Sequence, residues 1–157
     1  MNDSNITTGG CLCGAIRFEA NGRSLWQSIC YCESCCRSAG APLIAWACFD
    51  KINVKFVKGE TTRYQSSPGV YRGFCGSCGT TLTYGREPRD NQEDLNARPD
   101  EIFISISTFD DPEEFPPEEH IRYVERVSWL QIDDNLPKHK GFSATHRFRQ
   151  HQKSSCK

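Results

Sequence analysis

Residues 74–82 of the chain read FCGSCGTTL and place Cys75 and Cys78 three positions apart beside glycines. A second pair, Cys11 and Cys13, lies near the N-terminus in CLCGAI. Tetrahedral zinc binds four thiolates, and two short cysteine pairs from distant points of a chain are the usual way to supply them. Glycine lets the backbone turn tightly enough for its amides to approach the sulfur atoms. The two pairs therefore predict a structural zinc site.

A further group of thiols lies in SICYCESCCRSAG, residues 28–40. A disulfide between Cys30 and Cys32 is disfavoured, because disulfides need particular Cα separations and Cβ directions. The spacing of Cys30, Cys32 and Cys35 suits a second metal ion, and three protein ligands with one open position are the pattern of a catalytic zinc. In the alternative interpretation, Cys36 supplies a fourth thiolate and closes the site.

Length and charge limit the classes of function. A chain of 157 residues is expected to form one domain, since domains usually hold about 100–200 residues. Its 20 acidic and 19 basic residues give a net charge of −1, which would not attract nucleic acid. The longest apolar run, LIAWACF, is far shorter than the ~18 residues of a membrane-spanning helix. The opening MNDSNITTGG lacks the features of a secretory signal, which favours the cytoplasm, where disulfides are rare.

Alternating apolar residues predict an all-β fold with at most short helical turns. The alternation is clear for Ile16 and Phe18 in AIRFEA and in INVKFVKG. Short β-branched or aromatic segments predict further strands in LIAWACF, GVYRGFC, TTLTYG, EIFISIS and IRYVERV. Single helical turns are expected after Cys35 and in SWLQIDD. We expect a flexible N-terminus at residues 1–8, a zinc-binding β domain at 9–142 and a basic, mobile tail at 143–157.

Several motifs occur in a fixed order over residues 9–142. They are GGCLCGAIRF, CYCESCCRSAGAP, KGETTRYQSSPGVYRGFCGSCGTTLTY, EIFISISTFDDP and PPEEHIRYVERVSWLQIDDNLPKHKGF. In this combination the chain resembles the glutathione-dependent formaldehyde-activating enzyme family, also called the centromere protein V family. The resemblance implies several coiled antiparallel β-sheets with two zinc ions. The implied ligands are Cys11, Cys13, Cys75 and Cys78 for the structural zinc, and Cys30, Cys32 and Cys35 for the second.

The resemblance also implies an activity. In the enzyme that names the family, the second zinc serves the reaction of formaldehyde with glutathione, which gives S-hydroxymethylglutathione. We therefore expect a zinc-dependent carbon-sulfur lyase-type enzyme whose partner is a small thiol such as glutathione. Tyr31 stands where the family usually has a histidine, and a phenol titrates near pH ~10, so it is a poor proton shuttle near neutrality. Arg37 is a candidate for binding a carboxylate of the thiol ligand through its fork of donors.

Two other classes of function remain open from the sequence. One is a non-enzymatic zinc module that binds a protein partner, and the other is a thiol or metal buffer; binding of a small thiol or aldehyde at the second zinc would distinguish them from the enzyme. Trp46 and Trp129 are expected in the core rather than in a substrate site. Cys48 is expected to be a buried thiol. We do not expect His120 to bind a metal.

Overall fold

A computed structural model describes residues 5–87 and 100–142 of the chain, so the predicted basic tail lies outside the described residues. The described chain forms two β-sheets, one α-helix and four short 3-10 helices. The prediction of a mostly β domain is confirmed. No helix in these two ranges is long and apolar enough to cross a membrane.

The smaller sheet has three antiparallel strands in the order β1-β2-β5. Their bounds are β1 Ile6–Gly10, β2 Arg17–Asn21 and β5 Val54–Lys58. The predicted alternation in AIRFEA corresponds to β2, in which Phe18 and Ala20 are buried. Strand β1 begins at Ile6 and therefore includes residues 6–8, which the sequence analysis assigned to the flexible N-terminus.

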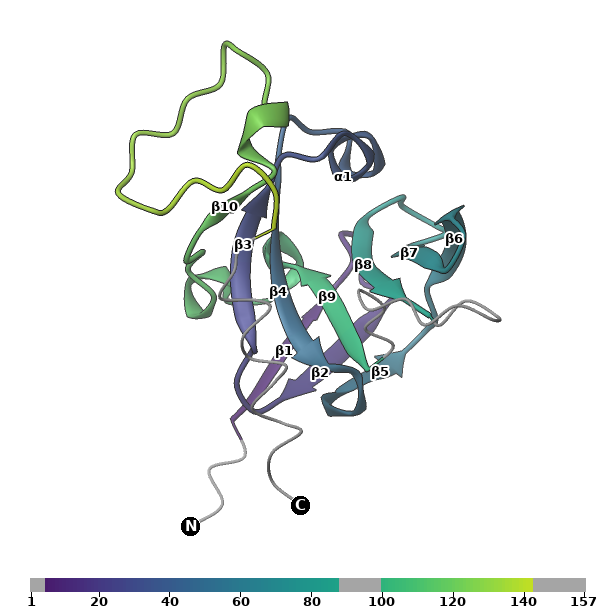
Figure 1. The fold of residues 1–157 in the computed structure, drawn as a ribbon. Coiled ribbons are helices and arrows are strands. Elements are labelled where there is room, and N and C mark those ends of the chain that lie inside the picture. Colours follow the sequence, from purple (N-terminus) through teal and green to yellow (C-terminus); the bar gives the residue numbers. More distant parts are fainter. Residues whose placement is uncertain (1–4, 88–99, 143–157) are drawn as a thin grey trace, which may run out of the picture.

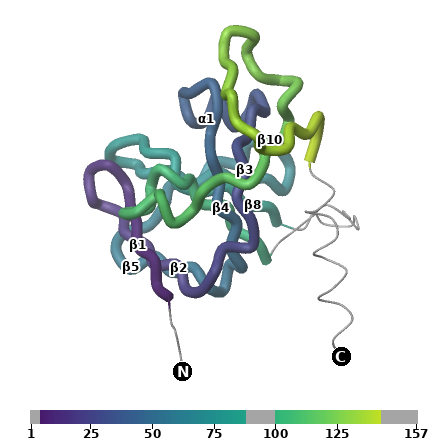
Figure 2. Tube along the Cα trace, turned by 90° about the vertical axis from the view of Figure 1, so that its left-hand side faces the viewer, coloured from purple at the N-terminus to yellow at the C-terminus, as the bar shows by residue number. Residues whose placement is uncertain are grey.

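The larger sheet has seven strands in the order β10-β3-β4-β9-β8-β7-β6. All neighbours are antiparallel except β10 and β3, which are parallel. The bounds are β3 Trp26–Cys30, β4 Ile44–Asp50, β6 Thr62–Ser67, β7 Val70–Phe74, β8 Thr81–Arg86, β9 Glu101–Ser105 and β10 His120–Ile121. Helix α1 spans Glu33–Ala39, and the 3-10 helices are η1 Lys51–Asn53, η2 Ile106–Thr108, η3 Pro112–Glu114 and η4 Tyr123–Glu125. Figures 1 and 2 place α1 at the opposite end of the molecule from the small sheet.

Strand β4 separates two hydrophobic clusters. Its side chains alternate, so that Ala47 and Phe49 pack in the cluster shared with the small sheet, while Trp46 and Cys48 pack in the cluster on the other face. Because both faces are covered, the strand reads in the sequence as the continuous apolar run LIAWACF. The predictions of a core position for Trp46 and of a buried thiol for Cys48 are confirmed.

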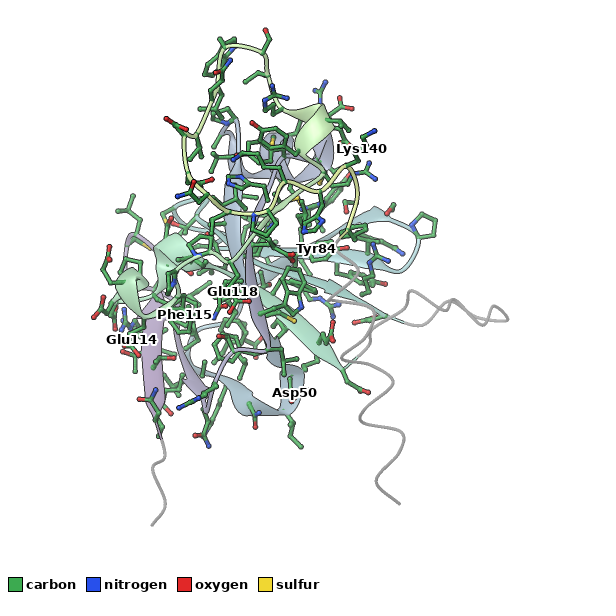
Figure 3. All side chains as sticks on the ribbon, turned by 60° about the vertical axis from the view of Figure 1, so that its left-hand side comes forward. Asp50, Tyr84, Glu114, Phe115, Glu118 and Lys140 are labelled. Carbon is green, nitrogen blue, oxygen red and sulfur yellow. The ribbon has the colours of Figure 1, made fainter. Side chains whose placement is uncertain are left out.

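Aromatic rings fill the space between the two sheets. The ring of Phe109 meets that of Phe18 edge-on at 5.2 Å between centroids and lies 4.1 Å from that of Phe115. Phe115, labelled in Figure 3, lies beside the small sheet. Burying each such side chain contributes about 1.5–3 kcal/mol relative to exposing it. The small sheet is therefore fixed to the large one by packing as well as by any metal between them.

Two local predictions were wrong, both near the C-terminal end of the described chain. IRYVERV was expected to be a strand, but only His120 and Ile121 pair, because the backbone turns at Arg122, whose φ is 56°. SWLQIDD contains no helix. Trp129 in this segment is 73% exposed, so it is not part of the core.

The backbone at Gly9 lies in close contact with the segment at Thr108 and Phe109. It forms an isolated bridge with Phe109, and a β-carbon at Gly9 would overlap the Thr108 carbonyl oxygen and the Phe18 ring. We expect Gly9→Ala to lower the free energy of unfolding by at least ~1–3 kcal/mol, the usual cost of overpacking, as measured by urea denaturation. The control is Gly85→Ala in β8, whose added β-carbon would lie 3.9 Å from the Glu101 carbonyl oxygen, an ordinary van der Waals contact. Equal effects of the two substitutions would contradict this account.

Candidate metal centres

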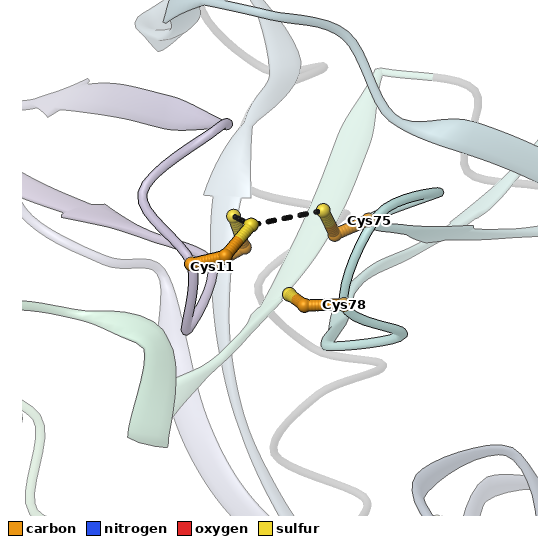
Figure 4. A group of neighbouring side chains, drawn as sticks. Cys11, Cys75 and Cys78 are labelled. Atoms are coloured by element: carbon orange, nitrogen blue, oxygen red, sulfur yellow. Dashed lines mark hydrogen bonds between the residues drawn. The ribbon is translucent and has the colours of Figure 1, made fainter.

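The first cysteine cluster lies between the two sheets. Cys11 and Cys13 follow β1, and Cys75 and Cys78 follow β7, so the two pairs approach from different sheets (Figure 4). All four sulfur atoms lie within 4.8 Å of one another. The Sγ of Cys13 lies 3.6 Å from that of Cys11 and 3.9 Å from that of Cys75. Tetrahedral zinc with sulfur at ~2.3 Å would separate its ligands by about 3.8 Å, so the residues fit a structural zinc ion.

Polar groups around this cluster favour thiolates. The backbone N–H of Ile16 donates to the Sγ of Cys11 at 3.2 Å. The Thr80 hydroxyl accepts from the backbone N–H of Leu12 at 3.1 Å, which leaves its own hydrogen for the Sγ of Cys78, also at 3.1 Å. The Thr80 hydroxyl and backbone lower the pKa of the Cys78 thiol to about 5. Hydrogen bonds of this kind orient metal ligands. Thr80 was not predicted as a site residue from the sequence, because its partners Leu12 and Cys78 lie in two turns that are far apart in the chain.

The second cluster forms where β3 meets α1. Cys30 ends β3, Cys32 is the N-cap of α1, and Cys35 lies in the first turn of the helix. Their sulfur atoms all lie within 4.8 Å of one another. The Sγ of Cys32 accepts a hydrogen bond from the backbone N–H of Cys35 at 3.4 Å, which explains the short spacing in the sequence. These three residues could hold a metal ion.

Within the described ranges, no fourth cysteine, histidine or carboxylate belongs to this group. Cys36 is excluded by helical geometry, because successive side chains of a helix point about 100° apart. Its backbone N–H bonds to the Cys32 carbonyl, which places it in the regular turn behind Cys35. The arrangement therefore favours the three-ligand interpretation over closure by Cys36.

Arg72 approaches the second cluster from β7. It is only 7% exposed, and its Nη1 donates to the Sγ of Cys35 at 3.6 Å. Hydrogen bonds from Cys30 and Cys32, together with Arg72, lower the pKa of Cys35. Hydrogen bonds to Cys32 and Cys35, followed by burial, raise the pKa of Cys30. Arg72 is not among the site residues predicted from the sequence, although its place in GVYRGFC, three residues before Cys75, is a signal that could have identified it.

Arg37, in contrast, points to solvent. Its side chain is 80% exposed, and its Nε donates to Glu33 one helical turn earlier at 2.8 Å. Both residues belong to α1, so the ion pair lies on the outer surface of the helix. Binding of a substrate carboxylate by Arg37 stays a prediction.

Tyr31 belongs to a buried hydrogen-bond network. Its hydroxyl lies 2.8 Å from Nδ1 of His120, and Nε2 of His120 lies 2.9 Å from the carboxylate of Asp134. Asp134 in turn accepts from Lys138 at 3.1 Å. With a neutral imidazole, Nε2–H donates to Asp134 and Nδ1 accepts from Tyr31. The network connects the residue between two cysteines of the second cluster to the segment at 134–138, which lies beside β10 (Figure 1) and pairs with His120 at Lys138.

Burial and hydrogen bonding shift the pKa values of Tyr31 and Asp134 in this network. Tyr31 is 1% exposed and His120 is fully buried. Burial raises the pKa of Tyr31 to about 12. Burial also raises the pKa of Asp134, but its hydrogen bonds to His120 and Lys138 outweigh that effect and bring the pKa below the usual value. Both ring nitrogens of His120 therefore have side-chain partners, neither of which is apparent from the sequence.

Removing the Tyr31 hydroxyl should destabilise the protein. In Tyr31→Phe, Nδ1 of the buried His120 loses its partner, and an unsatisfied buried polar group costs about 1–3 kcal/mol. We expect that loss in the free energy of unfolding from urea denaturation. The matched control is Tyr64→Phe, at a tyrosine that is 63% exposed. If both variants unfold at the wild-type urea concentration, the network does not contribute to stability.

Comparison with known proteins identifies the family of the chain and supports its fold. Residues 6–125 match the family described as "Glutathione-dependent formaldehyde-activating enzyme". A Schizosaccharomyces pombe protein named an uncharacterized lyase is 35% identical over 89 residues, which span 57% of this chain and 64% of that protein. A Rhodobacter sphaeroides protein of known crystal structure is 18% identical and shares the fold, with a TM-score of 0.51 over 83% of this chain and 98% of that one. Since the family match covers most of the sequence, the chain belongs to the glutathione-dependent formaldehyde-activating enzyme family.

Proposed function

We propose that the protein is a zinc-dependent enzyme of the carbon-sulfur lyase type, acting on the adduct of an aldehyde with glutathione or another small thiol. The observation that carries the proposal is the second cluster, in which Cys30, Cys32 and Cys35 come together without a fourth ligand among the described residues. Membership of the family and similarity to a protein named a lyase support the same chemistry.

Two zinc ions per chain are part of the proposal. Cys11, Cys13, Cys75 and Cys78 would hold a structural ion, and the second cluster would hold the ion that serves the reaction. Zinc bound at three cysteines would supply one further position that favours the ionised form of a thiol or polarises a carbonyl oxygen.

The residues of this chain would hold that site in place. Cys32 and Cys35 are fixed by the first turn of α1, and Cys30 is fixed by the pairing of β3 with β4 and β10. Tyr31 would support the site rather than move a proton, because its hydroxyl is buried against His120. The proposed domain spans 9–142, the proposed location is the cytoplasm, and the proposed partner is a small thiol rather than nucleic acid or a membrane.

The two clusters should respond differently to loss of a ligand. Cys78→Ser removes a ligand from the site that joins the sheets, and structural zinc contributes folding free energy of ~10 kcal/mol or more in zinc-finger peptides. We expect Cys78→Ser to be largely unfolded, whereas Cys32→Ser keeps the fold and loses one zinc ion. Metal analysis and thermal unfolding of both variants measure this. Equal losses of melting temperature would contradict the division of roles.

A small thiol should bind at the second cluster. We expect glutathione to change the visible spectrum of the cobalt-substituted protein, because the spectrum reports the number of sulfur ligands and their geometry. Cys36→Ser should respond as the wild type does, and Cys32→Ser should not respond. A spectrum that glutathione leaves unchanged, together with loss of a thiolate band in Cys36→Ser, would show a closed four-cysteine site and favour a binding module.

Catalysis is tested with a series of aldehyde–glutathione adducts. We expect the wild type to accelerate breakdown of at least one adduct and Cys32→Ser to accelerate none. For formaldehyde itself we expect little acceleration over the spontaneous reaction, since a general acid–base group contributes typically ~10²–10⁴-fold and Tyr31 replaces the usual histidine. NMR measurement of S-hydroxymethylglutathione exchange gives the rate. Failure with every adduct in a protein that binds glutathione would favour the thiol-buffer alternative.

A further inference from the structure

Arg72 is a buried cation whose partners point to a specific role. Its Nη1 donates to the Sγ of Cys35 at 3.6 Å, and its Nε donates to the Ser66 hydroxyl at 3.2 Å. The guanidinium carbon lies 5.2 Å from the centre of the Tyr84 ring, and Figure 3 labels Tyr84 near the middle of the molecule. Among residues 5–87 and 100–142, no carboxylate forms an ion pair with Arg72.

A buried charge without an opposite charge is costly, because desolvation is not offset by attraction. The guanidinium group of arginine is a cation in proteins. The group of opposite charge that it contacts is the second cysteine cluster, through Cys35. The positive charge of Arg72 is therefore balanced by the thiolates of that cluster rather than by another residue of the sheet.

The charge of the cluster explains what Arg72 would do there. Three thiolates around a divalent zinc ion leave a net charge of −1. An ionised thiol as the fourth ligand would make the net charge −2. Charges a few ångströms apart in a partly desolvated site interact far more strongly than they do in water, so a nearby cation decides whether the second negative charge is tolerated. With the guanidinium of Arg72 included, the net charge of the site and its surroundings is again −1.

We propose that Arg72 is the positioning residue of the second cluster, which compensates the charge of its thiolates and so permits an anionic sulfur ligand to bind. The proposal rests on the proposed function, because it assumes a metal ion on Cys30, Cys32 and Cys35. It adds a specificity: the site prefers an ionised thiol to a neutral oxygen ligand. Arg37 does not compete for this role, since its side chain is exposed and paired with Glu33.

The local fold is suited to hold an arginine rather than a lysine. Strand β6 has a register shift between Gln65 and Ser67, which leaves Ser66 outside the regular pairing and beside Arg72. Bulges of this kind redirect a side chain. The Nε and Nη1 atoms of one planar group thus reach two acceptors while its face lies over Tyr84, and the ammonium group of lysine cannot reproduce that geometry.

The test compares Arg72→Met and Arg72→Lys with Arg63→Met. Arg63 lies in β6 on the opposite face of the same hairpin, since it pairs with Gly73 whereas Arg72 pairs with Tyr64. Cobalt affinity is measured by competition with a chelator, and glutathione affinity by titration of the cobalt protein. Loss of a hydrogen-bond partner of a metal ligand typically costs about 10–100-fold in metal affinity. We expect a loss in this range for Arg72→Met, together with at least 10-fold weaker glutathione binding, an intermediate effect for Arg72→Lys and no change for Arg63→Met.

The outcomes separate this inference from the proposed function. Wild-type affinities for cobalt and glutathione in Arg72→Met would overturn the inference and leave the proposed function intact. A wild type that binds cobalt at the second cluster but no glutathione would overturn the proposed function and, with it, the anionic-ligand role of Arg72. If Arg72→Met does not fold, as judged by circular dichroism, the uncharged but polar Arg72→Gln takes its place, and wild-type affinities for cobalt and glutathione in that variant would overturn the inference.

Discussion

The structure depends on the contact between Cys11 and Cys13 after one sheet and Cys75 and Cys78 after the other. The two sheets share no strand, and the first pair is separated from the second by 62 positions between Cys13 and Cys75. Bringing such distant turns together has an entropic cost that grows slowly with loop length, and a metal ion bound to all four thiolates would offset it. The packed rings between the sheets then act on surfaces that this contact has already aligned.

The second cluster lies on the other side of β4, where Trp46 and Cys48 belong to the same hydrophobic cluster as Cys30 and Cys35. The central strand therefore separates the site proposed to hold the fold from the site proposed to do chemistry. The separation is consistent with different roles for the two clusters. The fully buried Tyr31–His120 contact gives this second site a support of its own.

Strand β7 connects the two sites. It carries Arg72 to the second cluster and leads directly into Cys75 of the first. Arg72 and Cys75 lie three positions apart, and side chains at an odd separation along an extended segment point to opposite faces. One short segment thus supplies a cation to the proposed reaction site and a thiolate to the proposed structural site.

The sequence by itself determined the features that depend on neighbouring residues: the cysteine spacings, the strands with a two-residue period and the helical turn after Cys35, which the structure extends back to Glu33. It did not determine Arg72, Thr80 or the pairing of Tyr31 with His120, because these contacts join residues 37, 68 and 89 positions apart. From the sequence we also predicted too long a strand in IRYVERV and a core position for Trp129, which is exposed. Local pattern shows that a residue can pair or be buried, whereas only the tertiary structure supplies the partner strand and the covering side chains.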